Sequence, residues 1–131
     1  MIDLIRWNKV FTVGLPELDA DHRESIRLIN QYIEGVNARK GREELSPILA
    51  DLAKLTRDHF ERENRIIDEY DVDNKDHVKE HDGLIAKLES ITGDLHKGDD
   101  AAVLSRTAER LKAWFVDHAV AFDSKIKGFF G

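Results

Sequence analysis

Apolar side chains recur along most of this chain at alternating steps of three and four residues. The steps fall in four stretches of roughly 20 residues or more, separated by short polar segments. Because an α-helix has about 3.6 residues per turn, such steps keep the apolar side chains on one face. The clearest stripes are Ile26, Ile29, Ile33 and Val36 in the first stretch, and Leu84, Leu88, Ile91 and Leu95 in the third. The pattern predicts four amphipathic helices, over residues about 19–38, 43–70, 75–96 and 100–122.

Local signals suggest where these helices begin and end. Asp19 is the expected N-cap of the first helix, with Asp21 as an alternative. The first helix should stop at the basic turn that leads into Gly41. Ser46 and Pro47 would also suit an N-cap and a first turn, so the second helix could begin there instead of at residue 43.

The two ends of the chain lie outside the four stretches. Residues 1–17 contain Gly14 and Pro16, which interrupt a helix, so this segment is expected to be an arm that packs across one end of the helices. Residues 123–131 form a short amphipathic segment, and we expect a helical tail there with Phe129 and Phe130 on its apolar side.

Four long amphipathic helices with short connections favour an all-α fold. The expected architecture is an antiparallel up-down-up-down four-helix bundle that forms one domain over residues 1–131. The alternating steps of three and four residues are typical of helices that cross at shallow angles.

Composition and charge narrow the possible functions. The net charge of −6 and the absence of a Lys/Arg stripe argue against nucleic acid as a partner. No apolar run approaches the roughly 20 residues of a membrane span, and the first residues lack the features of a signal peptide, so a cytoplasmic location is expected. The chain has no cysteine, so a bound metal would depend on imidazole and carboxylate ligands.

The histidines provide the strongest chemical signal. Five of the six continue the apolar stripes as though they were core residues, and only His96 does not. Burying an imidazole without a partner costs a few kcal/mol, whereas a small domain is stable by only about 5–15 kcal/mol. A metal would supply a partner for all five, which are His22, His59, His77, His81 and His118.

Two carboxylates join these histidines in the same part of the predicted bundle. Glu63 lies one helical turn beyond His59, and Asp123 follows His118. All seven residues fall at helix ends that an up-down-up-down bundle gathers at one pole. Five imidazoles and two carboxylates are too many for one ion, so two bridged ions are expected. In a regular helix Asp123 would point about 140° away from His118, which predicts a widened turn or an early helix end between them.

These residues resemble the hemerythrin family, in particular the single-domain hemerythrins of the bacterial type. The resemblance rests on Trp7, Asp19-Ala20-Asp21-His22, His59-Phe60-Glu61-Arg62-Glu63, His77-Val78-Lys79-Glu80-His81 and Trp114-Phe115-Val116-Asp117-His118 with Asp123. It covers nearly the whole chain, with all seven ligand positions filled in order.

The resemblance implies two iron ions in a non-haem, oxo- or hydroxo-bridged di-iron centre. Glu63 and Asp123 would bridge the irons, His77, His81 and His118 would bind the coordinatively filled iron, and His22 and His59 would bind the iron that keeps an open position for dioxygen. Trp114 and Phe115 would line the oxygen pocket. The chain departs from the family pattern at Asp21, where Gln is common, at Asn64, where Glu is usual, and at Ile67, where Met is usual.

Reversible dioxygen binding for storage, delivery or scavenging is therefore the leading functional hypothesis, without turnover of an organic substrate. An oxygen or redox sensor that acts through a separate protein partner is one alternative. A di-iron enzyme of the peroxidase or nitric oxide reductase type is another, although the chain lacks the Glu-x-x-His pairs of ferritin-like oxidases. A zinc site is a third alternative, and it fits this ligand set less well.

Overall fold

The computed structural model describes residues 2–12, 14–69, 75–94 and 101–121. Within these ranges the chain forms a short 3₁₀ turn, η1 (Lys9–Phe11), and four α-helices. The helices are α1 (Pro16–Asn37), α2 (Arg42–Glu69), α3 (Lys75–Asp94) and α4 (Ala101–Ala121), and no strand occurs among the described residues. The predicted all-α class is confirmed. The predicted tail over residues 123–131 lies outside the described ranges.

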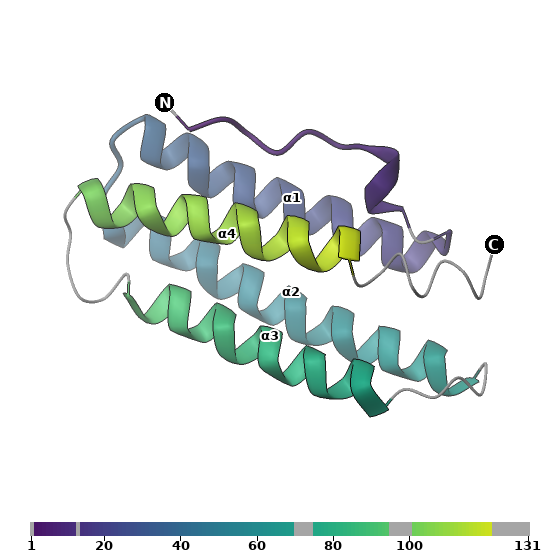
Figure 1. Cartoon of the computed structure of the whole chain (residues 1–131). Coiled ribbons are helices and arrows are strands. Elements are labelled where there is room, and N and C mark those ends of the chain that lie inside the picture. Colours follow the sequence, from purple (N-terminus) through teal and green to yellow (C-terminus); the bar gives the residue numbers. More distant parts are fainter. Residues whose placement is uncertain (1, 13, 70–74, 95–100, 122–131) are drawn as a thin grey trace.

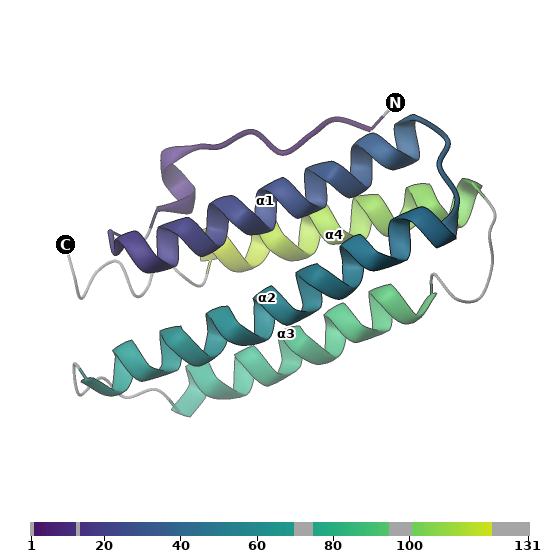
Figure 2. The same cartoon turned by 180° about the vertical axis from the view of Figure 1, so that it is seen from behind.

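The four helices pack side by side with alternating directions, as the colours of Figures 1 and 2 show. α1 packs against α2 and α4, and α3 packs against the other side of the same two helices. The architecture is the predicted antiparallel four-helix bundle. None of the described helices is long and apolar enough to cross a membrane.

The first helix begins before the predicted N-cap. α1 starts at Pro16 with Leu15 as its N-cap, so the expectation of an N-cap at Asp19 or Asp21 is wrong. Proline suits the first helical position because its φ angle is already helical and the N–H that it lacks would have no partner there. Asp19 instead lies in the first turn, where a negative charge is favoured by the helix dipole.

α1 ends in a Schellman motif that does not use the expected glycine. Arg39 has a φ of 61°, the N–H of Lys40 donates to the carbonyl of Gly35 at 2.9 Å, and that of Arg39 donates to Val36 at 3.0 Å. The chain then enters α2 at Arg42, so Pro47 lies inside that helix instead of opening it.

The core occupies the centre of the bundle and receives side chains from all four helices. The most deeply buried include Ile29, Ile33, Leu52, Leu88, Ile91 and Leu111. Burial of one such side chain contributes about 1.5–3 kcal/mol. At the end of α1, a Cβ on Gly35 would overlap the side chain of Leu45, so glycine allows α1 and α2 to approach closely.

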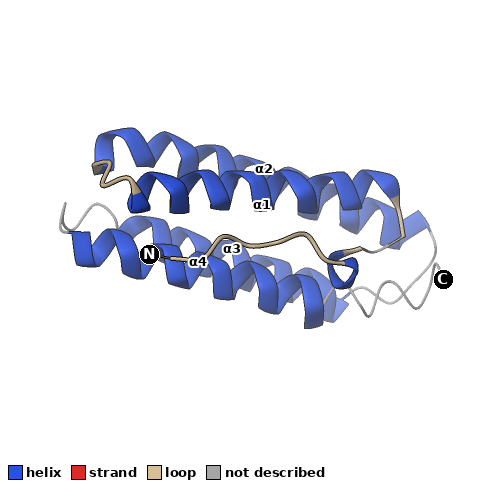
Figure 3. Ribbon diagram, turned by 90° about the horizontal axis from the view of Figure 1, so that it is seen from above, coloured by secondary structure: helices blue, strands red, loops and turns tan. Residues whose placement is uncertain are grey.

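The N-terminal arm runs lengthwise along the bundle, and the prediction that it crosses one end is wrong. Figures 1 and 3 show residues 2–12 following α1 in the opposite direction. The side chain of Asn30 accepts from the N–H of Ile5 at 2.8 Å and donates to its carbonyl at 2.9 Å. Asn37 holds Ile2 in the same way, at 3.0 Å for both bonds. The arm also places Ile5 and Phe11 in the core.

Asn30→Ala should loosen the arm. Because two hydrogen bonds of about 0.5–1.5 kcal/mol each are lost, the free energy of unfolding should fall by about 1–3 kcal/mol. Urea denaturation of the metal-free protein, followed by circular dichroism, measures this change. Gln31→Ala is the control, since Gln31 is exposed on the same helix. An equal loss in both variants would show that the two hydrogen bonds between Asn30 and Ile5 do not stabilise the arm.

Candidate metal centre

Five of the predicted site residues converge at one pole of the bundle. This pole is the end where α1 and α3 begin and where α2 and α4 end, on the right of Figure 1. α1 contributes His22, α2 contributes His59 and Glu63, α3 contributes His81 and α4 contributes His118. All five are buried, with exposed fractions of 5% or less. Ring centroids are 5.0 Å apart for His22 and His59, 6.5 Å for His59 and His118, and 6.0 Å for His81 and His118.

Two of the predicted metal ligands, His77 and Asp123, lie outside the side chains that the structure describes. His77 belongs to the first turn of α3, but its side chain is among those not described, and Asp123 lies beyond the described part of α4. The backbone of α4 is α-helical from Ala101 to Ala121. The predicted change of helix geometry before Asp123 therefore stays a prediction.

Glu63 is the centre of the cluster. Its side chain is fully buried, and its two oxygens face different helices. Oε2 lies 3.0 Å from Nε2 of His59, and Oε1 lies 3.2 Å from Nε2 of His81. His118 also belongs to the cluster, because ligand atoms of His59, Glu63 and His118 lie within 4.8 Å of one another. One carboxylate thus connects histidines from two neighbouring helices.

Three of the histidines form a hydrogen bond through Nδ1, the ring nitrogen other than Nε2. His22 Nδ1 lies 2.6 Å from the carbonyl oxygen of Phe11, and His59 Nδ1 lies 3.0 Å from Oδ2 of Asp21. His81 Nδ1 lies 3.0 Å from Oδ1 of Asn64. A carbonyl or carboxylate oxygen can only accept, so each Nδ1 carries a proton and donates it. In a neutral ring this leaves the Nε2 lone pair available to a cation.

The geometry around Glu63 favours a bound cation. With Nδ1 protonated, neutral rings of His59 and His81 present Nε2 lone pairs to the Glu63 oxygens. Lone pairs about 3 Å apart need a proton or a metal ion between or beside them, and one proton on Glu63 could satisfy only one of the two rings. Two adjacent ligands of one ion are also roughly 3 Å apart when the metal–ligand bonds are about 2.1 Å. The imidazole and carboxylate donor set therefore fits a transition metal.

Asp21 and Arg62 form a charged pair behind His59. Arg62 donates from Nε to Oδ2 of Asp21 at 3.0 Å and from Nη2 to Oδ1 at 2.7 Å. Burial raises the pKa of Asp21, but the hydrogen bonds from His59 and Arg62 outweigh it, and the net pKa is lowered from 3.8. Asp21 is therefore a carboxylate at neutral pH. Hydrogen bonding to Asp21 in turn raises the pKa of Arg62.

Sequence reasoning missed these outer partners. The sequence patterns assign no role to Arg62, yet it binds Asp21 through two hydrogen bonds and its side chain is only 31% exposed. Asp21 and Asn64 stood out in the sequence as departures from the family pattern, and both prove to contact a histidine of the cluster. Asp21 directly precedes His22 and Asn64 directly follows Glu63 in the sequence, and this position beside predicted ligands is the signal that could have identified them.

Aromatic rings enclose the cluster. Phe60 stacks on His81, with centroids 4.0 Å apart and planes inclined by 6°, and it meets His118 edge to face at 5.1 Å. Phe115 approaches His22 edge to face at 5.8 Å. The indole N–H of Trp114 donates to the carbonyl of Leu84 at 3.1 Å, which ties α4 to α3. Two phenylalanine rings thus contact the histidines beside their polar partners, and the four described histidines of the cluster are buried from water.

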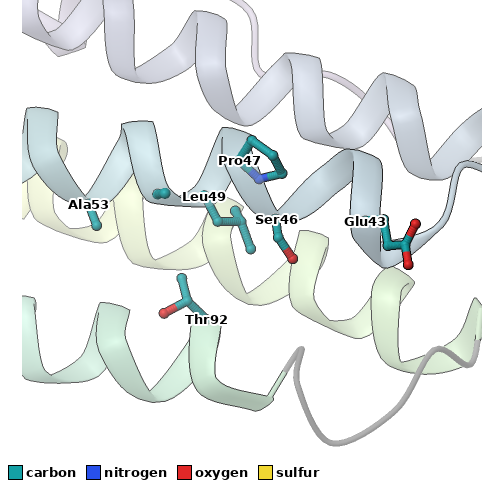
Figure 4. Close-up of a pocket in the computed structure, with 7 residues that line it drawn as sticks. Glu43, Ser46, Pro47, Leu49, Ala53 and Thr92 are labelled. Carbon is teal, nitrogen blue, oxygen red and sulfur yellow. The ribbon is translucent and has the colours of Figure 1, made fainter.

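A surface pocket elsewhere on the bundle has a different character. It has a volume of about 460 Å³ and lies between the first half of α2 and the end of α3 (Figure 4). Its lining is mainly apolar, with Glu43, Ser46 and Thr92 as the polar members, and it contains no histidine. This pocket is therefore separate from the histidine cluster.

Comparisons with known proteins agree with this site. Residues 13–129 match the family model described as the hemerythrin HHE cation binding domain. A myohemerythrin of Riftia pachyptila is 32% identical over 123 residues, which cover 93% of this chain and 90% of that protein. A bacteriohemerythrin of Aquifex aeolicus is 28% identical over 123 residues, covering 92% and 93% of the two chains. The chain therefore belongs to the hemerythrin family, a family of iron-binding helical bundles, and the resemblance seen in the sequence is confirmed.

Glu63→Gln should severely weaken metal binding, because it replaces the buried carboxylate at the centre of the cluster by a neutral amide. We expect the affinity for Co²⁺, measured by isothermal titration calorimetry, to fall by at least the roughly 10–100-fold that is typical when an outer partner of a metal ligand is removed. Glu61→Gln is the matched control, since Glu61 is exposed on the same helix. Equal affinities for the two variants would refute the central role of Glu63.

Proposed function

We propose that this chain holds two iron ions at the pole containing Glu63 and binds dioxygen there reversibly, for storage, delivery or scavenging. The observation that carries the proposal is the buried Glu63 carboxylate, which faces Nε2 of His59 on one side and Nε2 of His81 on the other. Membership of the hemerythrin family supports it. So do the names of the two relatives, a myohemerythrin and a bacteriohemerythrin.

In this proposal the carboxylates of Glu63 and Asp123 would be shared by the two irons. His77, His81 and His118 would hold one iron, and His22 and His59 would hold the other. Two irons are favoured over one because this set contains more ligands than a single ion can accept. The iron pair, when bound, supplies the electrons needed for reversible binding of dioxygen.

The described residues would support this function in two ways. The Nδ1 hydrogen bonds to Phe11, Asp21 and Asn64 hold three rings in orientation before metal arrives, which lowers the cost of assembling the site. Phe60 and Phe115 exclude water from the histidines, and a dry site slows the loss of a reduced oxygen species to solvent. These features favour holding a small ligand over processing a large substrate.

Iron content and oxygen response test the proposal directly. Protein reconstituted with ferrous iron should hold close to two irons per chain and should be nearly colourless without oxygen. It should colour on exposure to air and bleach again when oxygen is removed. An anaerobic-to-aerobic optical titration, with iron measured on the same sample, provides the result. Colouring that never reverses would refute reversible binding and would favour an enzyme or a sensor.

Two histidine variants test the ligand assignment. His118→Ala removes a buried ring of the cluster, so it should lose iron and lower the melting temperature of the iron-loaded protein, because metal binding is coupled to folding. His96→Ala should keep both irons, since His96 does not continue an apolar stripe of the sequence. Iron analysis with thermal denaturation measures both effects. Loss of iron in His96→Ala would overturn the assignment.

A further inference from the structure

The two histidines next to Glu63 differ in the group that accepts the hydrogen bond from their Nδ1 atom. His59 donates to the carboxylate of Asp21, whereas His81 donates to the neutral amide of Asn64. Glu63 presents one oxygen to each of these rings. The two sides of the cluster therefore have similar geometry at Nε2, and they differ by one negative charge at Nδ1.

We propose that Asp21 is a positioning residue that makes His59 a stronger electron donor than His81, and that Arg62 limits this effect. The inference rests on the proposed metal function, and it concerns how this chain sets the properties of that site. A carboxylate that accepts the Nδ1 proton draws it away from the ring and increases the electron density at Nε2. A neutral amide does this less strongly.

Arg62 acts on the same carboxylate. Its Nε shares Oδ2 of Asp21 with His59, and its Nη2 binds the other oxygen. The guanidinium therefore draws negative charge away from the oxygen that accepts from His59. It also adds a positive charge near a cation site. The Asp21 side chain is 11% exposed and that of Arg62 is 31% exposed, so water screens the pair only in part.

This arrangement predicts opposite effects for the two partners. Asp21→Asn keeps an oxygen that can accept from His59 but removes the negative charge, so His59, like His81, then donates to a neutral amide. Arg62→Gln leaves Asp21 charged and removes the guanidinium that shares Oδ2 of Asp21 with His59. Nε2 of His59 then becomes a stronger electron donor. If the pair were only a structural clamp, both variants would weaken metal binding.

The experiment compares wild type, Asp21→Asn and Arg62→Gln by Co²⁺ titration and by the midpoint potential of the iron-loaded protein. Asp21→Asn should weaken Co²⁺ binding by about 10–100-fold and raise the potential, because the higher oxidation state loses more stabilisation. Arg62→Gln should tighten Co²⁺ binding by about two- to fivefold, as expected for one partly exposed charge, and lower the potential.

Arg57→Gln is the matched control. It removes one positive charge from the same helix, but Arg57 pairs with Glu89 on the surface at 2.8 Å, and both side chains are more than half exposed. This variant should bind Co²⁺ like the wild type. Circular dichroism and thermal denaturation of each metal-free variant establish that it is folded before titration.

The outcomes separate this inference from the proposed function. Opposite shifts of affinity and potential in the two variants support the role of Asp21 and Arg62. Shifts in the same direction, or no shift in either variant while the wild type binds metal, overturn it and leave the metal function intact. Failure of the wild type to bind metal refutes the proposed function itself.

Discussion

A carboxylate that is fully buried between two imidazoles constrains this molecule more than any other interaction. Glu63 has no exposed surface, and each of its oxygens meets an Nε2 atom from a different helix. Removing an anion from water costs several kcal/mol unless positive charge compensates it. In the proposed function a metal ion supplies this positive charge, so metal binding would also stabilise the folded pole that contains Glu63. Because Glu63 and the histidines around it are buried, water screens this electrostatic attraction weakly.

The apolar core and the polar cluster occupy different parts of the bundle along its length. The central part is a conventional apolar core built from residues such as Ile29, Leu52 and Leu111, and the close approach at Gly35 brings α1 and α2 together at the far end. This packing holds the four helices side by side along the part of the bundle away from the polar cluster. The helices can then present histidines in a defined arrangement, since their directions are already set when a ligand arrives.

The sequence predicted the helices well because their periodicity records the burial of one face. The same periodicity indicated that five histidines face inward, and the structure brings His22, His59, His81 and His118 together around Glu63. It did not predict the partners behind the rings. Asp21 and Arg62 lie 41 residues apart in the chain, and only the packing of α1 against α2 decides that they meet. The start of α1 was also misplaced, because Pro16 determines it and the acidic residues that follow only stabilise the first turn. The course of the arm depends on Asn30 and Asn37, whose spacing has no distinctive pattern in the sequence.

The hydrogen bond between His22 and Phe11 differs in kind from the other two. Its acceptor is a main-chain oxygen, supplied by the turn at Lys9–Phe11. No exchange of one amino acid for another at position 11 can delete that atom. Alanine scanning would attribute to Phe11 only the loss of its ring, and the support given to His22 would go undetected. The hydrogen bond to His22 thus places no demand on the side chain at this position, which is constrained instead by its burial in the core.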